Sequence, residues 1–128
     1  RVWIFGSSKE QALGAAIAAQ AGPGAQNLCG RTALADAVDL IGLCRAAVSN
    51  DSGLMHIAAA AGVPLVAIYG SSTPDYTPPL TDRAAILWRR LSCSPCFERN
   101  CPLGHTDCLC GITPNGVLTA LEGLLPNA

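Results

Sequence analysis

The 128-residue chain contains little charge and few aromatic residues. Charged residues make up 13% of it, aromatic residues 5%, and the formal net charge is −1. Lysine occurs once, at Lys9, and the other basic residues are arginines. A chain without a basic excess has no overall field that attracts nucleic acid or an anionic membrane. We therefore expect no nucleic-acid partner.

The sequence also lacks the run of about 18 apolar residues that a membrane-spanning helix needs, and no signal peptide is visible. Half of its residues are apolar, which is typical of a globular domain. The chain starts at Arg1 and passes at once into the strand-like segment "RVWIF". A domain rarely begins inside a strand, so we expect that the N-terminal part of a longer protein is missing.

Apolar strand-like segments alternate with helix-like segments over the first 70 residues. Strands are expected over 1–5, 25–30, 46–50 and 65–70, and helices over 9–21, 31–46 and 52–62. Continuous apolar strands joined by helices are typical of a parallel sheet that is covered on both faces. The sequence therefore predicts an α/β fold, a Rossmann-like parallel sheet with helices on both faces, in one domain over 1–128.

The pattern changes after Gly70. A Pro-, Ser- and Thr-rich loop over 71–83 precedes a fifth strand over 84–90 and an irregular cysteine-rich loop over 92–111. A last helix is expected over 113–126, with Thr113 as its cap. Two helices carry stripes that are expected to be buried: Leu34, Val38, Ile41 and Cys44 in the second, and Val117, Leu118, Leu121 and Leu125 in the last.

Ligands of open α/β sheets bind beyond the carboxyl ends of the strands. Three of the predicted ends carry polar residues: Ser7, Ser8 and Lys9 in "GSSKE", Gly30, Arg31 and Thr32 in "CGRT", and Asp51, Ser52, Gly53 and His56 in "NDSGLMH".

The turn "NDSGLMH" carries the most chemistry. Asp51 or Ser52 is expected to cap the helix, and Gly53 allows a ligand to approach the backbone. The free N–H groups and the helix dipole favour a phosphate, to which His56 could donate from the same face. Asp51 would repel a phosphate, so we expect it to turn toward sugar hydroxyls or a backbone cap. Taken alone, these residues also fit a purely capping role.

Several nucleotide and nucleophile motifs are absent. The chain has no G-x-G-x-x-G, no G-x-x-x-x-G-K-[ST] and no G-x-S-x-G. Arginines gather at Arg83, Arg89, Arg90 and Arg99, which fits a solvated face or an anionic partner.

The cysteine-rich loop has the spacing C-x2-C-x4-C-x6-C-x-C, with His105 inside it. Zinc sites commonly use four Cys or His ligands, and the candidates here are Cys93, Cys96, Cys101 and Cys108. The second half of the loop lacks a matching C-x2-C pair. We therefore expect no metal and interpret these residues as reduced, packed thiols.

A longer resemblance joins these features. "NLCGRTALADAVDLIGLCRAAVSNDSGLMHIAAAAGVPLVAIYGSSTP" resembles the donor-binding half of the bacterial lipopolysaccharide heptosyltransferases, and "CSPCFERNCPLGHTDCL" resembles the C-terminal segment of their type II members. The resemblance implies the C-terminal half of a GT-B glycosyltransferase, whose N-terminal acceptor domain is absent from this chain. It implies ADP-heptose binding by Asp51, Ser52, Gly53, Leu54, Met55 and His56, and less directly by Gly30, Arg31, Thr32, Ser8 and Lys9.

The resemblance also implies a reaction. Heptose is transferred with inversion to a lipid A-linked inner-core oligosaccharide, and the catalytic base lies in the N-terminal domain. It implies no catalytic residue in this chain, no cofactor and no metal, so the chain alone is expected to bind donor weakly and to turn over nothing. The implied location is cytoplasmic, with peripheral contact to the inner membrane of a Gram-negative bacterium.

Two alternatives stay open. A sugar-nucleotide 2-epimerase also uses a D-S-G turn, but a Gly-Gly-Glu-type continuation would be expected where this chain has "GLMH". A metal-binding or interaction module centred on the cysteine-rich loop is the other alternative.

Overall fold

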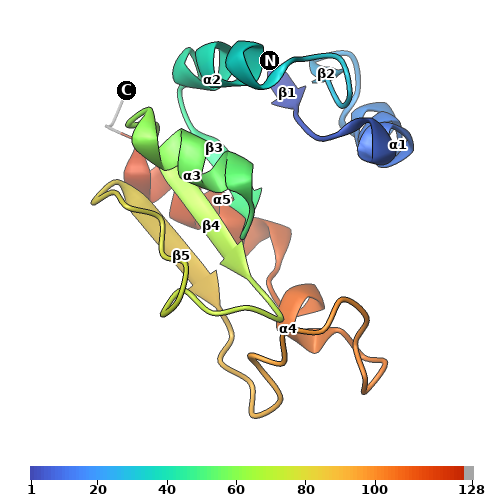
Figure 1. The fold of residues 1–128 in the computed structure, drawn as a ribbon, viewed down its shortest axis with the longest axis vertical. Helices are drawn as coiled ribbons and strands as arrows, with labels where there is room; N and C mark the ends of the chain where they lie inside the picture. Colours follow the sequence, from blue (N-terminus) through green and yellow to red (C-terminus); the bar gives the residue numbers. More distant parts are fainter. Residues whose placement is uncertain (126–128) are drawn as a thin grey trace. The chain divides into compact units, whose positions relative to one another are not determined.

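Every strand of the structure runs parallel to its neighbours, as the alternation of strands and helices predicts. The computed structural model describes residues 1–125, and its strands form two sheets instead of the single sheet expected. A two-stranded sheet lies in a first compact unit, Arg1–Leu40, and a three-stranded sheet lies in a second unit that starts at Ile41 (Figure 1).

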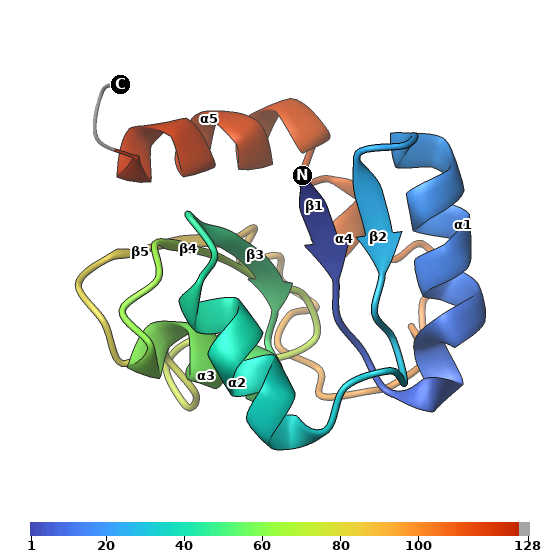
Figure 2. The same cartoon turned by 90° about the horizontal axis from the view of Figure 1, so that it is seen from above.

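The first unit is a strand–helix–strand element. Strand β1 (Val2–Ile4) leads through the 3-10 helix η1 (Ser8–Glu10) into α1 (Gln11–Ala21), and β2 (Ala25–Asn27) then pairs with β1. Figure 2 shows α1 alongside β2. This close approach depends on Gly14, which is buried at a point where a side chain would collide with Asn27 and Cys29.

Helix α2 (Leu34–Gly42) is shorter than the predicted 31–46, and it spans the boundary between the two units. The backbone N–H of Ala33 donates to the Asp36 carboxylate at 3.0 Å, which fixes the start of the helix. The predicted stripe is only partly correct. Ile41 is buried, whereas 70% of the Leu34 surface and 41% of the Val38 surface are exposed, because Ala37 and Ile41 form the inward face.

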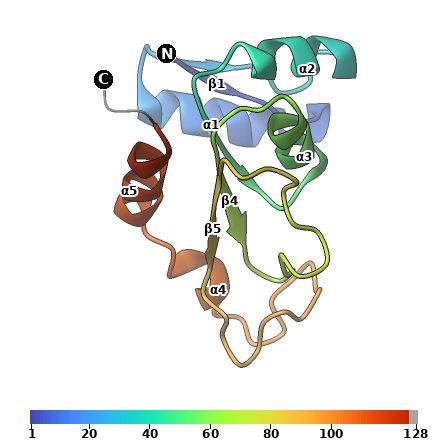
Figure 3. The same cartoon turned by 90° about the vertical axis from the view of Figure 1, so that its left-hand side faces the viewer.

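The second unit has a central strand with helices on both faces. Strand β4 (Leu65–Tyr69) lies between β3 (Ala47–Asn50) and β5 (Ala84–Trp88). Figure 3 shows α3 (Gly53–Ala60) on one side of this sheet and α5 (Pro114–Leu124) on the other. The predicted covering of both faces is thus confirmed for this sheet.

Burial explains the composition of these elements. Leu65, Val66 and Tyr69 in β4 have no exposed surface, as the continuous apolar run predicts for a central strand. The small side chains of Ala58 and Ala59 are buried on α3, and they let the helix lie close to the sheet.

The ends of the second unit's elements are held by local contacts. The Thr113 hydroxyl accepts a hydrogen bond from the Gly116 backbone at 3.1 Å, which confirms the predicted cap of α5. Leu118 was predicted to be buried but is 52% exposed, and Pro126 lies outside the described residues. A one-turn helix α4 (Asp107–Cys110), which the sequence did not predict, interrupts the cysteine-rich loop. No helix of residues 1–125 is long and apolar enough to cross a membrane.

Strands β3 and β4 end side by side, where α3 begins. Asn50 is the register partner of Ile68, and the Asp51 N–H donates to the Ile68 carbonyl at 3.1 Å. The other end of α3 is also fixed, because Nη1 of Arg83 donates to the Gly62 carbonyl at 2.7 Å. The first turn of α3 is therefore the polar end of a firmly held helix.

Replacement of Gly30 by alanine tests the close approach of two turns in the first unit. Gly30 has a φ of +68°, and a Cβ there would lie 2.7 Å from the Ser8 Cα. We expect Gly30→Ala to lower the free energy of unfolding by about 1–3 kcal/mol, measured by urea denaturation. Gly24→Ala is the matched control, because its Cβ would meet nothing within 4 Å. Equal losses in the two variants would contradict this reading of the turn.

Candidate functional site

The turn between β3 and α3 leaves the helix N-terminus uncapped by a side chain. Ser52 occupies the N-cap position with extended backbone, but its hydroxyl makes no capping hydrogen bond. That hydroxyl instead lies 3.2 Å from the Ser49 hydroxyl, which itself donates to the Asn50 carbonyl. Because the Ser49 proton is already used, Ser52 is the donor of this pair. The expectation that Ser52 occupies the N-cap is confirmed, but the cap is made by its backbone carbonyl, which accepts from the Met55 N–H at 3.1 Å. The N–H groups of Gly53 and Leu54 remain available at the helix terminus.

Gly53, the first residue of α3, faces open space. A Cβ placed on it would meet no atom within 4 Å, and its φ is not in the left-handed region. Neither packing nor backbone conformation therefore requires a glycine here. His56 lies one turn further along the helix and is exposed. This part of α3 can accept an anion at its backbone, with an imidazole beside it.

Met55 is the exception among the predicted donor-binding residues of this turn. It has no exposed surface, and its Sδ lies 3.5 Å from the Tyr69 hydroxyl. Met55 lies on the side of α3 that packs on the sheet, so its side chain belongs to the core. Leu54, its neighbour, is half-buried.

Asp51 turns toward a residue that the sequence did not single out. Its two carboxylate oxygens accept from the Thr77 hydroxyl at 3.2 and 3.1 Å. The carboxylate thus points to a side-chain hydroxyl of the loop over 71–83, and neither caps the helix nor acts as a free base. The abundance of hydroxyl residues in this loop was the only signal that could have indicated such a partner.

The buried Tyr69 binds the same Thr77 that contacts Asp51. Its hydroxyl donates to the Thr77 carbonyl at 2.5 Å, so one residue binds both the buried tyrosine and the aspartate. Burial, and to a smaller extent the nearby negative charge of Asp51, raise the pKa of Tyr69 to about 12, while interaction with the Thr77 side chain opposes the shift. The phenol therefore stays protonated at neutral pH and remains a donor.

The predicted residues of the first unit gather at the ends of β1 and β2. The Gly30 N–H donates to the Gly6 carbonyl at 2.9 Å, and Gly30 packs against Ser8. Lys9 and Arg31 are exposed and Thr32 is half-buried. Ser8, Lys9, Gly30, Arg31 and Thr32 thus form one polar group within their own unit.

Ser7 has a structural role in this group. Its backbone N–H and its hydroxyl donate to the Glu10 carboxylate at 2.7 and 2.9 Å. These two bonds lower the pKa of Glu10, with the backbone bond the larger cause. Ser7 is therefore occupied in starting η1.

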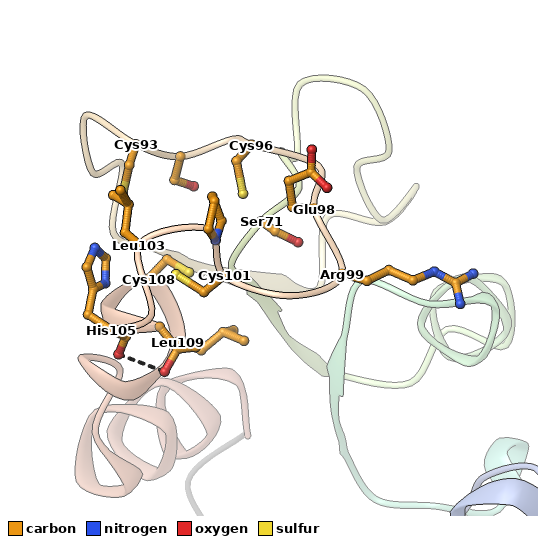
Figure 4. Close-up of a pocket in the computed structure, with 13 residues that line it drawn as sticks. Ser71, Cys93, Cys96, Glu98, Arg99, Cys101, Leu103, His105, Cys108 and Leu109 are labelled. Carbon is orange, nitrogen blue, oxygen red and sulfur yellow. Dashed lines mark hydrogen bonds between the residues drawn. The ribbon is translucent and has the colours of Figure 1, made fainter.

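The cysteine-rich loop encloses a small pocket of about 80 Å³. The lining includes all four cysteines that were weighed as metal ligands, together with His105, and Figure 4 shows how they lie. Within residues 1–125, however, no three His, Cys, Asp or Glu side chains are arranged to hold a metal ion. All seven cysteines are free thiols. Backbone N–H groups, that of Thr106 above all, lower the pKa of Cys101.

Three of the four clustered arginines have partners within the fold. Arg83 holds the end of α3, and Nη1 of Arg89 donates to the Asp107 carbonyl at 3.0 Å. The Arg90 guanidinium lies 4.8 Å from the centre of the Trp88 ring. These contacts favour a structural role for the cluster over an anionic partner.

Comparison with known proteins places the chain in a family. Residues 1–107 match the model of glycosyltransferase family 9 (heptosyltransferase). Lipopolysaccharide heptosyltransferase 2 of Salmonella typhimurium is 42% identical over 98% of this chain, and lipooligosaccharide heptosyltransferase 2 of Haemophilus influenzae is 53% identical over 67%. The chain spans 37% of the first of these proteins and 26% of the second.

Solved structures agree with this placement. The Escherichia coli ADP-heptose lps heptosyltransferase II matches with a TM-score of 0.82 and 42% identity, over 97% of this chain and 36% of that one. A family 9 glycosyl transferase from Veillonella parvula matches with a TM-score of 0.79 and 26% identity, over 95% and 35%. The fold is thus that of the GT-B glycosyltransferases to which these structures belong. The chain belongs to glycosyltransferase family 9, the heptosyltransferases, and the family resemblance of its motifs is confirmed.

The titration of Tyr69 tests the environment beneath Asp51. Because the pKa of Tyr69 in the fold is about 12, above its ordinary value of 10.0, its contribution to stability is present at neutral pH. This contribution to stability is lost as the pH rises from 10.0, the ordinary pKa of tyrosine, through about 12, the pKa of Tyr69 in the fold. In a Tyr76→Phe variant, where Tyr69 is the sole tyrosine, we expect tyrosinate absorbance to appear well above the pH seen for the same variant in urea. If tyrosinate absorbance appeared at the same pH in the folded and the urea-unfolded protein, the burial of the Tyr69 hydroxyl near Asp51 would be contradicted.

Proposed function

We propose that this chain binds ADP-heptose for inverting transfer of the heptose to the inner core of lipopolysaccharide. The observation that carries the proposal is the uncapped N-terminus of α3, with open space at Gly53 and the exposed His56 one turn away. The family membership supports the sugar-nucleotide class of the ligand. The alternatives of a 2-epimerase and of a metal-binding module gain no support from the comparisons or from the arrangement of the cysteines.

The diphosphate of the donor is proposed to lie at the first turn of α3. A transferred sugar leaves ADP with additional negative charge on its terminal phosphate. Backbone N–H groups at a helix N-terminus and a donating imidazole stabilise such charge without reorganisation, which lowers the barrier to departure. The absence of a side chain at Gly53 keeps those N–H groups accessible. His56 would donate to a phosphate oxygen from the same face.

The remaining candidates receive secondary roles. Asp51, held by Thr77, is proposed to position a sugar hydroxyl next to the diphosphate. Ser8, Lys9, Gly30, Arg31 and Thr32 are proposed to contact the nucleotide. The base that deprotonates the acceptor hydroxyl is proposed to come from the N-terminal acceptor domain of the GT-B architecture. The acceptor is a lipid A-linked inner-core oligosaccharide, reached at the cytoplasmic face of the inner membrane.

Substitution of His56 tests whether this histidine binds the ligand or is only a surface residue. We expect His56→Ala in the full-length protein to weaken ADP binding roughly tenfold in isothermal titration, because a hydrogen bond to a charged group is lost. The matched control is His105→Ala, since His105 is the only other histidine and lies in the cysteine-rich loop. Equal affinities of the His56 variant and the unmodified protein would remove His56 from the site.

Substitution of Gly53 tests the open helix terminus itself. We expect Gly53→Val to fold with an unchanged urea midpoint, because its Cβ meets nothing, and to lose ADP and ADP-heptose binding through shielding of the N–H groups. Gly123→Ala, at another open helical glycine, should leave ADP and ADP-heptose binding unaltered and raise the urea midpoint slightly, because alanine favours the helix. Ser52→Ala should weaken binding less than His56→Ala, since the Ser52 hydroxyl is committed to Ser49. Undiminished ADP binding by Gly53→Val would show that the anion does not lie at α3.

A further inference from the structure

Two aromatic side chains of the second unit stack on each other at the surface. The rings of Tyr76 and Phe97 have centroids 5.7 Å apart and an angle of 11° between their planes. They are nevertheless 76% and 57% exposed. The chain has only two tyrosines and two phenylalanines, so half of them lie in this pair. Stacking covers one face of each ring and leaves the outer faces to solvent.

The pair lies at the same sheet edge as the α3 turn. Tyr76 directly precedes Thr77, whose hydroxyl donates to the Asp51 carboxylate. The Phe97 N–H donates to the Ser71 carbonyl at 2.7 Å, just beyond the end of β4. In Figure 3, the loops that carry the two rings leave β4 and β5 at this end. The carboxyl edge of a parallel sheet is where ligands of such folds bind.

The cysteine-rich loop holds Phe97 in place at a conformational cost. Phe97 has a φ of +58°, in a region that bulky residues rarely adopt. Two hydrogen bonds hold the loop at the end of β4. One is the bond from the Phe97 N–H to the Ser71 carbonyl, and in the other the Ser94 hydroxyl donates to the Gly70 carbonyl at 2.5 Å. Neither bond involves a thiol. The loop therefore works as a support that presents one aromatic ring outside the core.

We propose that Tyr76 and Phe97 form a platform on which a sugar ring stacks, beside the diphosphate position at α3. Sugar rings have a C–H face that packs on an aromatic ring and hydroxyls that a carboxylate can accept, and Asp51 lies between the helix terminus and Tyr76. This inference rests on the proposed function. The sugar belongs either to the donor or to the acceptor, and the two sources differ in which binding constant depends on the rings.

Isothermal titration of the full-length protein with ADP and with ADP-heptose tests the platform. For a donor sugar, we expect Tyr76→Ala and Phe97→Ala each to weaken ADP-heptose binding about fivefold or more, while ADP binding stays unchanged. For an acceptor sugar, both titrations stay unchanged and the KM for the acceptor rises by a similar factor. Tyr76→Phe should restore the unmodified values in either case. Leu80→Ala and Leu103→Ala are matched controls, because both remove exposed apolar side chains from the same two loops.

Two results would overturn the platform. An equal loss of ADP and ADP-heptose affinity would mean that the rings contact the nucleotide and not a sugar. No change in any of the three constants would mean that the rings contact no substrate. If the unmodified protein binds neither ADP nor ADP-heptose, the proposed function itself fails, and the platform fails with it. Circular dichroism of each variant confirms that the fold is retained.

Discussion

The hydrogen bond between the Tyr69 hydroxyl and the Thr77 carbonyl connects the core of the second unit with its polar edge. Tyr69 ends the central strand and is fully buried, so its hydroxyl needs a partner within the protein. It finds one in a loop that has no regular structure of its own. The other end of the same residue, the Thr77 hydroxyl, then holds Asp51. The need to satisfy one buried hydroxyl thus fixes a loop, a carboxylate and, next to them, the ring of Tyr76.

Features that depend on local sequence could be predicted, and those that depend on the meeting of distant segments could not. The burial of β4, the start of α3 beside Ser52 and the Thr113 cap follow from runs of a few residues. The contact between Asp51 and Thr77 joins residues 26 positions apart, and the pair of Tyr76 and Phe97 joins two loops without periodicity. Periodicity also misjudged α2, where Ala37, a residue too small to stand out, faces inward in place of Leu34.

The cysteine-rich loop shows how a conspicuous composition can mislead. Its thiols suggest ligand chemistry, but the contacts that fasten it to the sheet come from Ser94 and from the backbone of Phe97. Four of its five thiols line a pocket that the loop forms together with Ser71. The arginines behave similarly, since the charges of Arg89 and Arg90 are directed to a carbonyl oxygen and to the Trp88 ring. The cysteines and arginines, which resemble a ligand-binding set in the sequence, are therefore engaged in contacts within the fold.

The contact of Arg83 with Gly62 has an electrostatic consequence for the opposite end of α3. The guanidinium places a permanent positive charge at the negative pole of the helix dipole. An anion near the first turn would otherwise feel the attraction of the near pole reduced by the repulsion of the far one, across only eight residues. Because Arg83 partly offsets the far pole, the positive field of this short helix at Gly53 is less opposed. A residue on the opposite side of the unit can therefore strengthen anion attraction without approaching the anion.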